Sequence, residues 1–290
     1  MANAFEAVPI PAWLVGDKSM CTEKPASSRL RSRGISRYTR RTLLISSLVS
    51  GIAGASVGCQ SIAPQPLPPG QPSPRLGTSD AITSPLPPLP ATGGPSVEAA
   101  IAARRSVRNY ADRPVTLEQL ARLLHYTTGV TDPEHGFRAA PSAGALYPIE
   151  VYPVIFRVEG IAPGVYHYLV GQHALALVRA GDIRSDMQRA ALFQSMITTA
   201  ALVLVLTGVP ARSTGKYGER GQRYLLLEAG HIGENAYLEA TTLGLGCCAI
   251  GAFLDAEVDR LLGVDGRAET SVFMLALGPL GTASHLQAIG

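Results

Sequence analysis

Three arginines and a serine gather in one short stretch, RRSVRNY at residues 104–110. A guanidinium group binds a phosphate through two parallel hydrogen bonds, and a serine hydroxyl adds another donor. The stretch therefore predicts a site for a phosphate-bearing ligand, formed by Arg104, Arg105, Ser106 and Arg108. A solvated helix end would carry the same residue types, and from this stretch alone the two interpretations stand equal.

Small residues fill a second stretch, APSAGALYP at residues 140–148. Side chains of this size let a backbone lie close to a flat ligand, and an ordinary turn needs fewer of them. The candidates for such contact are Pro141, Ser142, Ala143 and Gly144. A third stretch, Gly251 and Ala252, follows an expected strand, where bare backbone could also face a ligand. The nearby Gly244 and Gly246 do not form a dinucleotide-binding motif, because they follow a helix and precede a strand.

Lys216 is the only lysine after Lys24 in a chain that otherwise uses arginine. A desolvated amine can lose its proton near neutral pH whereas a guanidinium cannot, so Lys216 and Tyr217 could form an acid/base pair. A surface lysine without a role is the alternative. Ser213 and Lys216 also match the Ser-x-x-Lys motif of penicillin-binding serine hydrolases, but the companion Ser-Asp-Asn and Lys-Thr-Gly motifs do not follow.

Histidines do not indicate a metal site. Their positions show no spacing typical of metal ligands, and we expect most of them to be hydrogen-bonded structural residues. The six are His125, His135, His167, His173, His231 and His285.

Capping residues, hydrophobic periodicity and β-branched runs predict the elements that must position these side chains. Helices are expected at residues 96–104, 116–128, 183–193, 218–243 and 255–262. Strands are expected at residues 149–158, 164–177, 201–207, 247–250 and 270–277. Both element types alternate without a regular order, which is typical of an α+β domain on one sheet. The adjacent Cys247 and Cys248 could pair only with strain, so we expect no disulfide in this domain.

An export signal is expected near the N-terminus. Residues 36–59 have a basic start, an apolar run at 43–57 too short to span a bilayer comfortably, and then small residues. The sequence TRRTLL at 39–44 is typical of a twin-arginine signal. Residues 56–59 resemble a lipoprotein cleavage box that would place lipid on Cys59, although Ser56 stands where Leu is usual. An amphipathic or core helix is the alternative, and Met20 could be the true start.

Prolines and charges divide the chain. Eleven of the 22 prolines lie between Pro64 and Pro95, and such a stretch stays extended as a tether, or alternatively serves as a polyproline ligand. We therefore expect a leader at 1–59, a Pro-rich linker at 60–95 and a folded domain at 96–290. Residues 1–58 carry eight basic and three acidic residues, which leaves 17 basic and 19 acidic residues after them. The domain has no basic field for nucleic acid.

The motifs RRSVRNY, PSAGALYPIEVY, GVYHY, KYGERGQRYLLLEAGHIGENAYLEATTLGLG and IGAF follow one another along the chain. With them, about residues 96–280 resemble the nitroreductase-like flavoprotein superfamily, and within it the SagB-type dehydrogenases, which oxidise azolines to azoles in modified peptides. The resemblance implies a nitroreductase-like fold with a central mixed sheet flanked by helices. It also implies an intertwined homodimer that binds FMN at its interface.

The same resemblance implies roles for the candidate residues. Arg104, Ser106 and Arg108 would hold the phosphate and the polar edge of the flavin ring, with Arg105 nearby. The stretch of Pro141, Ser142, Ala143 and Gly144 would contact the flavin from the other subunit. Gly251 and Ala252 would lie near N5, the hydride-accepting atom. Lys216 and Tyr217 match the acid/base pair of SagB-type enzymes.

Together these inferences predict an exported, lipid-anchored FMN oxidoreductase that takes a hydride from a small-molecule or peptide substrate, such as an azoline. Outside the membrane NAD(P)H is not available, so reoxidation by oxygen or a quinone is expected. One alternative is an NAD(P)H-dependent nitro- or quinone reductase. Another is a non-catalytic lipoprotein that binds flavin or a partner. The export signal departs from the peptide-modifying members, which work with cytoplasmic partners.

Overall fold

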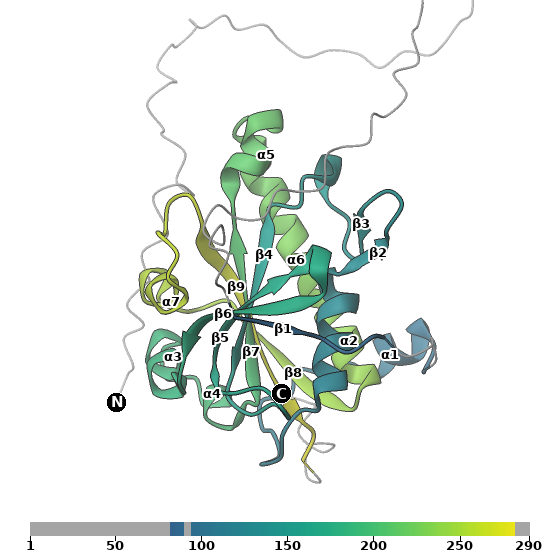
Figure 1. The fold of residues 1–290 in the computed structure, drawn as a ribbon, viewed down its shortest axis with the longest axis vertical. Helices are drawn as coiled ribbons and strands as arrows, with labels where there is room; N and C mark the ends of the chain where they lie inside the picture. Colours follow the sequence, from purple (N-terminus) through teal and green to yellow (C-terminus); the bar gives the residue numbers. More distant parts are fainter. Residues whose placement is uncertain (1–81, 90–93, 282–290) are drawn as a thin grey trace, which may run out of the picture. The chain divides into compact units, whose positions relative to one another are not determined.

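A computed structural model describes residues 82–89 and 94–281 (Figure 1). The expected export signal, the cleavage box at Cys59 and most of the linker lie outside the described residues. Within the described part of the chain, no helix is both long enough and apolar enough to cross a membrane.

Seven strands of the described chain form one sheet in the order β1-β6-β5-β4-β7-β9-β8. They are β1 (Thr83–Pro85), β4 (Ile149–Ile155), β5 (Gly164–Leu169), β6 (Ala174–Ala180), β7 (Leu202–Gly208), β8 (Leu245–Ile250) and β9 (Thr270–Pro279). The α+β class is confirmed. The mixed pairing is not, because neighbouring strands of this sheet pair antiparallel throughout. Parallel pairing occurs at isolated bridges, such as Ser106 with Cys247. A separate hairpin joins β2 (Val130–Asp132) and β3 (Phe137–Arg138).

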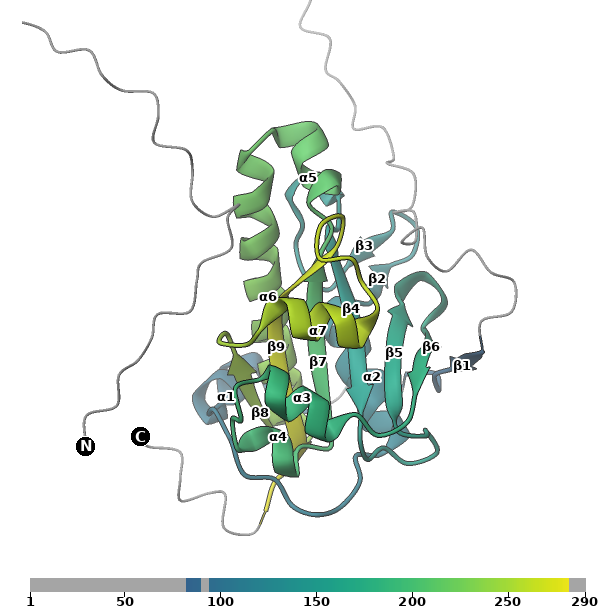
Figure 2. The ribbon, with the colours of Figure 1, turned by 90° about the vertical axis from the view of Figure 1, so that its left-hand side faces the viewer.

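Helices cover both faces of the sheet (Figures 1 and 2). On one face, α2 (Leu117–Thr128) and α6 (Arg220–Thr242) share a core with Leu202, Leu204 and Leu206 of β7. On the other face, α3 (Arg184–Ala190), α4 (Met196–Thr199) and α7 (Asp255–Leu262) pack around Val203 and Val205 of the same strand. Successive side chains of a strand point to opposite faces, so one apolar run serves both cores.

Local sequence signals account for two of the helix starts. Thr116 and Gln119 form the expected capping box at the start of α2. Ser96 caps α1 (Val97–Ala103) as expected. Of the apolar residues predicted to share one face of α1, however, only Ala100 is buried, and Val97 and Ile101 are more than half exposed. A helix of two turns can bury only a narrow stripe against its neighbour α6.

Three other expectations need correction. The strand predicted at 164–177 is a hairpin of β5 and β6, because His173 adopts a left-handed conformation after the 3-10 turn Val170–Gln172. The long helix predicted from residue 218 begins at Arg220, and a separate helix, α5 (Pro210–Tyr217), precedes it. Gly218, at a φ of 57°, makes the break between the two helices. Part of the expected tether, β1, pairs with β6 as an edge strand and is followed by the buried Leu86.

Candidate functional site

The small-residue stretch forms a loop before β4 with a strained backbone. Gly144 has a φ of 64°, and Ala145 and Tyr147 also have positive φ angles of 53° and 46°. A positive φ is costly for residues other than glycine, so other contacts must hold this conformation. The backbone N–H of Tyr147 donates to the hydroxyl of Ser142 at 2.9 Å, which closes the loop upon itself.

Lys216 and Tyr217, at the end of α5, lie over this loop. A Cβ atom added to Gly144 would stand 2.6 Å from the hydroxyl oxygen of Tyr217 and 2.8 Å from Nζ of Lys216. Nζ of Lys216 also lies 5.5 Å from the centre of the Tyr217 ring. The structure therefore brings together two separate sequence predictions, the acid/base pair and the ligand-contacting loop, and only a glycine fits between them.

Buried charges lie under the loop and connect it to α5. Glu150 of β4 forms an ion pair with Arg212 of α5 at 2.6 Å and a contact with Nε2 of His167 at 2.8 Å. The second terminal nitrogen of Arg212 donates to the carbonyl oxygen of Tyr147 at 2.8 Å. Burial acts to raise the pKa of Glu150, but the hydrogen bond with His167 and the charge of Arg212 outweigh it, so that this pKa lies below its ordinary value.

A second buried carboxyl group, Glu228 of α6, faces the same loop. Burial raises the pKa of Glu228 to about 7, although a hydrogen bond with Ser142 and the charges of Arg138 and Arg212 act in the opposite direction. The guanidinium of Arg138 stacks over the ring of Tyr147, 4.4 Å from its centre. Glu228 is therefore a group that can exchange a proton near neutral pH, directly beneath the loop.

The arginine cluster lies beside β8, at the end of α1. The guanidinium of Arg104 lies 5.3 Å from the centre of the Tyr237 ring, and the hydroxyls of Ser106 and Tyr237 are 3.2 Å apart. Arg108 is exposed. Arg105 instead turns back to the carbonyl oxygens of Ala102 and Arg104. Arg105 therefore fits the alternative interpretation, a solvated helix end. Arg104, Ser106 and Arg108 instead present hydrogen-bond donors beside the buried strand β8.

Gly251 and Ala252 follow β8 and are both exposed. A Cβ atom at Gly251 would meet nothing within 4 Å, so the backbone there faces open space. The carbonyl oxygen of Ala252 accepts a hydrogen bond from the side chain of Gln194 at 2.7 Å. This contact fixes the segment without covering it.

Helix α6 contacts both groups of candidates. Its Tyr224 meets Tyr217 edge to face and its Glu228 bonds to Ser142, while its Tyr237 contacts the arginine cluster. Glu228 and Tyr237 are nine residues apart, or about 14 Å of helix. The two groups of candidate residues therefore lie at separate positions along the same helix.

These residues fit FMN. Arg104, Ser106 and Arg108 offer cationic and hydroxyl donors suited to a phosphate, while Gly251 and the loop around Gly144 offer exposed backbone for a flat ring. A serine hydrolase fits less well, because Ser213 is only 1% exposed within α5. In the described part of the chain, no group of three or more His, Cys, Asp or Glu side chains is placed to hold a metal ion.

Sequence reasoning missed the buried carboxyl groups of Glu150 and Glu228 and the partly buried arginines beside them, Arg138 and Arg212. The signal that could have found Glu150 is its place in the otherwise apolar strand IEVYPVI. A charged residue is almost never fully buried without a partner. Its partner Arg212 is distant in sequence and could be found only from the folded chain.

The nitroreductase family model matches residues 101–279, more than half of the chain. A presumed nitroreductase of Methanocaldococcus jannaschii is 43% identical over 159 residues, which are 55% of this chain and 80% of that protein. The trifolitoxin-processing protein TfxB of Rhizobium leguminosarum bv. trifolii is 32% identical over 170 residues, 54% of this chain. The chain spans only 46% of TfxB.

Solved structures show the same fold. A presumed nitroreductase of Ralstonia eutropha aligns with a TM-score of 0.61 and 28% identity, over 75% of this chain and 98% of that chain. A chain of the Escherichia coli microcin synthetase McbBCD complex with truncated pro-MccB17 bound aligns with a TM-score of 0.57 and 26% identity, over 67% of this chain and 76% of that chain. The predicted resemblance is confirmed, and the chain belongs to the nitroreductase family.

Proposed function

We propose that this nitroreductase-family oxidoreductase uses FMN to dehydrogenate an organic substrate, with Lys216 and Tyr217 as its acid/base pair. The observation that carries the proposal is the placement of Nζ of Lys216 and the hydroxyl of Tyr217 against Gly144. Polar atoms that can move a proton thereby meet the loop expected to contact the flavin. When bound, FMN would supply the hydride acceptor, its N5 atom.

Each group of residues has a distinct task in this proposal. Arg104, Ser106 and Arg108 bind the phosphate and the polar edge of the ring. The loop formed by Pro141, Ser142, Ala143 and Gly144 contacts the ring from a second copy of the chain. Gly251 and Ala252 lie near its reactive edge, and their small size lets the substrate approach. These contacts would orient the substrate and exclude water from the reacting atoms.

Dehydrogenation of an azoline-like substrate removes two electrons and two hydrogens, one as a hydride and one as a proton. Nζ of Lys216 accepts the substrate proton. The adjacent hydroxyl of Tyr217 hydrogen-bonds to the substrate and orients it for this transfer. An arginine in place of Lys216 could not do this, because a guanidinium does not release its proton near neutral pH.

A homodimer would bring the two groups of candidate residues together. Val97 and Ile101 of α1 are 65% and 55% exposed, and Leu227 of α6 is 53% exposed. A second copy that covered these side chains would remove their apolar surface from water. We include in the proposal that a second copy covers these helices.

The proposal also includes export and a lipid anchor at Cys59, so that oxygen or a quinone serves as the final electron acceptor. A peptide substrate is supported by the similarity to the trifolitoxin-processing protein and to the microcin synthetase complex. Because the similar chain belongs to a multi-protein complex, we also include a partner protein in the proposal. The second candidate function, an NAD(P)H-dependent nitro- or quinone reductase, is favoured by the 43% identity to a presumed nitroreductase.

One experiment separates these functions. The protein is reconstituted with FMN and mixed anaerobically with a synthetic thiazoline dipeptide or with NADPH, while flavin absorbance is followed. We expect the thiazoline to bleach the flavin, and Lys216→Met to slow this about 10²-fold to 10⁴-fold with FMN still bound. Fast bleaching by NADPH alone would support the reductase. Bound flavin that neither compound bleaches would support a binding protein.

A further inference from the structure

Arg212 lies one helical turn before Lys216 on α5, and residues four apart share a helix face. We propose that Arg212 is a positioning residue, which joins α5 to the loop at residues 141–148 and so fixes Lys216 and Tyr217 over Gly144. The functional part of this inference rests on the proposed function, in which those two side chains act on the substrate.

Helix α5 depends on tertiary contacts for its position. It has eight residues, and its first turn lacks a side-chain cap. A helix this short is not stable by itself. Two contacts join its start to the strand and loop beside it: the backbone N–H of Val209 donates to the carbonyl oxygen of Pro148 at 2.8 Å, and Arg212 reaches both Tyr147 and Glu150.

Arg212 uses its two terminal nitrogens on different acceptors. Nη1 donates to the carbonyl oxygen of Tyr147, and Nη2 pairs with Oε1 of Glu150. The other carboxylate oxygen of Glu150 is held by His167, whose ring stacks on Tyr152 with 4.7 Å between centres. The carboxylate is therefore fixed, and a planar fork is needed to reach both acceptors at once. A lysine would present a single point charge.

The same contact explains how the strained loop persists. Tyr147 has a positive φ of 46°, yet both of its backbone polar groups are satisfied. Its N–H donates to Ser142 and its carbonyl accepts from Arg212. Without Arg212 the carbonyl loses its charged donor, and the loop is free to relax away from the strained conformation. Gly144 would then no longer lie against Lys216 and Tyr217.

Hydrogen–deuterium exchange of the full-length protein without FMN tests the structural step. Arg212→Lys keeps the charge that Glu150 needs, so this variant is expected to fold. We expect about tenfold faster exchange in peptides covering 141–148 and 210–217, and unchanged exchange in β8 and β9. The control is Arg184→Lys, another arginine that binds carbonyl oxygens, which should change exchange around residues 196–200 instead.

Unchanged exchange in both peptides, or a uniform rise across the sheet, would overturn the proposal. The functional step is tested with the FMN-loaded protein and the thiazoline dipeptide. Arg212→Lys should lower the maximal bleaching rate about tenfold at unchanged FMN content and unchanged half-saturating thiazoline concentration. An unaltered maximal rate would also overturn it. If the wild type does not react with the thiazoline, the proposed function fails, while the exchange result still decides whether Arg212 fixes the loop.

Discussion

Two groups of arginines lie at opposite ends of the central strand pair β4 and β7. The pair is antiparallel, with Ile149 opposite Gly208 at one end and Ile155 opposite Leu202 at the other. Arg212 and Arg138 lie at the first end, beside the loop and α5. Arg157, which follows β4, and Arg184 of α3 lie at the second end, where they donate to the carbonyl oxygens of Thr199 and Ala200 just before β7.

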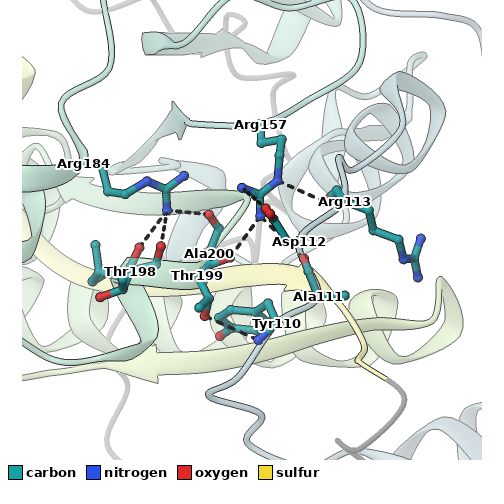
Figure 3. Close-up of polar contacts among 10 residues, drawn as sticks. Tyr110, Ala111, Asp112, Arg113, Arg157, Arg184, Thr198, Thr199 and Ala200 are labelled. Atoms are coloured by element: carbon teal, nitrogen blue, oxygen red, sulfur yellow. Dashed lines mark hydrogen bonds and ion pairs between the residues drawn. The ribbon is translucent and has the colours of Figure 1, made fainter.

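At the second end the arginines bind mainly backbone carbonyl oxygens (Figure 3). Arg184 donates to the carbonyls of Ile197, Thr198 and Ala200 at 2.8–3.0 Å, which satisfies the end of α4. Arg157 reaches the carbonyls of Arg113, Ala111 and Thr199. Its carboxylate partner Asp112 is 94% exposed.

At the first end, by contrast, the carboxylate partner is buried: the side chain of Glu150 is only 8% exposed. Burying charges is costly unless each is paired, so an ion pair in such a place contributes little net stability yet is expensive to break. The comparison teaches that arginines beside one sheet can have different structural roles. One group satisfies carbonyl oxygens at the end of a helix, and the other, in our proposal, fixes a strained loop beside Lys216 and Tyr217.

The largest expected loss of stability follows from breaking the ion pair between Glu150 and Arg212. Glu150→Ala leaves Arg212 without its buried carboxylate partner and should destabilise the protein by about 3–5 kcal/mol. The matched change at the other end, Asp112→Ala, should cost less than about 1 kcal/mol because Asp112 is exposed. Urea unfolding of both variants measures the difference. Equal losses would contradict the contrast between the two ends.

The dependence of stability on pH tests the first end of the strand pair further, because the buried Glu228 lies beside the loop there. Since its pKa is about 7 in the folded state and about 4.3 when unfolded, only the folded state holds the proton between these values. Stability from this group therefore falls as the pH rises through that window, by roughly 4 kcal/mol in total. Glu228→Gln should be more stable than wild type at pH 8 by up to that amount, and similar at pH 4. Parallel unfolding profiles for the two proteins would refute this expectation.

The capping arginine at the second end should matter for stability alone. In Arg184→Lys the guanidinium nitrogen Nη1, which contacts three carbonyl oxygens, is replaced by an ammonium on a shorter side chain, so the change should cost about 1–2 kcal/mol in thermal unfolding. FMN affinity should stay as in wild type. Arg189→Lys on the same helix, whose ion pair with Asp186 is half exposed, is the control and should shift stability by less than about 0.5 kcal/mol. A clear loss of FMN affinity in Arg184→Lys would contradict the expectation that this arginine contributes to stability alone.

The smallest effect on stability is expected at two glycines. Gly144→Ala and Gly136→Ala both place a Cβ at a positive φ, 64° and 70°, so each should cost about 1 kcal/mol. Only at Gly144 would the new Cβ meet Lys216 and Tyr217. Bleaching of the flavin by the thiazoline dipeptide should therefore slow in Gly144→Ala and not in Gly136→Ala. Equal rates would show that the close approach at Gly144 has no role.

The candidate site residues that the sequence indicated are those whose signals are local. The small-residue loop, the lone Lys216 and the arginine cluster each stand out within a few positions, and the capping box at Thr116 marks the start of α2. Helix α5 was missed because its sequence, PARSTGKY, is mostly small and polar, although Pro210 at its first turn was an available signal.

The buried network could not be predicted in this way. Glu150 and Arg212 are 62 positions apart and meet only because β4 pairs with β7 and α5 follows β7. Pairing partners within a sheet are set by the whole chain, and no local pattern encodes them. The same holds for Ser142 and Glu228, whose contact depends on how α6 packs over the sheet.

Titration of the purified protein with FMN, followed by visible absorbance, tests the central claim most directly. The proposal predicts saturable binding, with a bound-flavin spectrum distinct from that of free FMN. It also predicts that Arg108→Ala weakens binding about tenfold or more, through loss of a charged phosphate donor. A spectrum identical to free FMN at every concentration would contradict the assignment of this chain as a flavin-dependent enzyme.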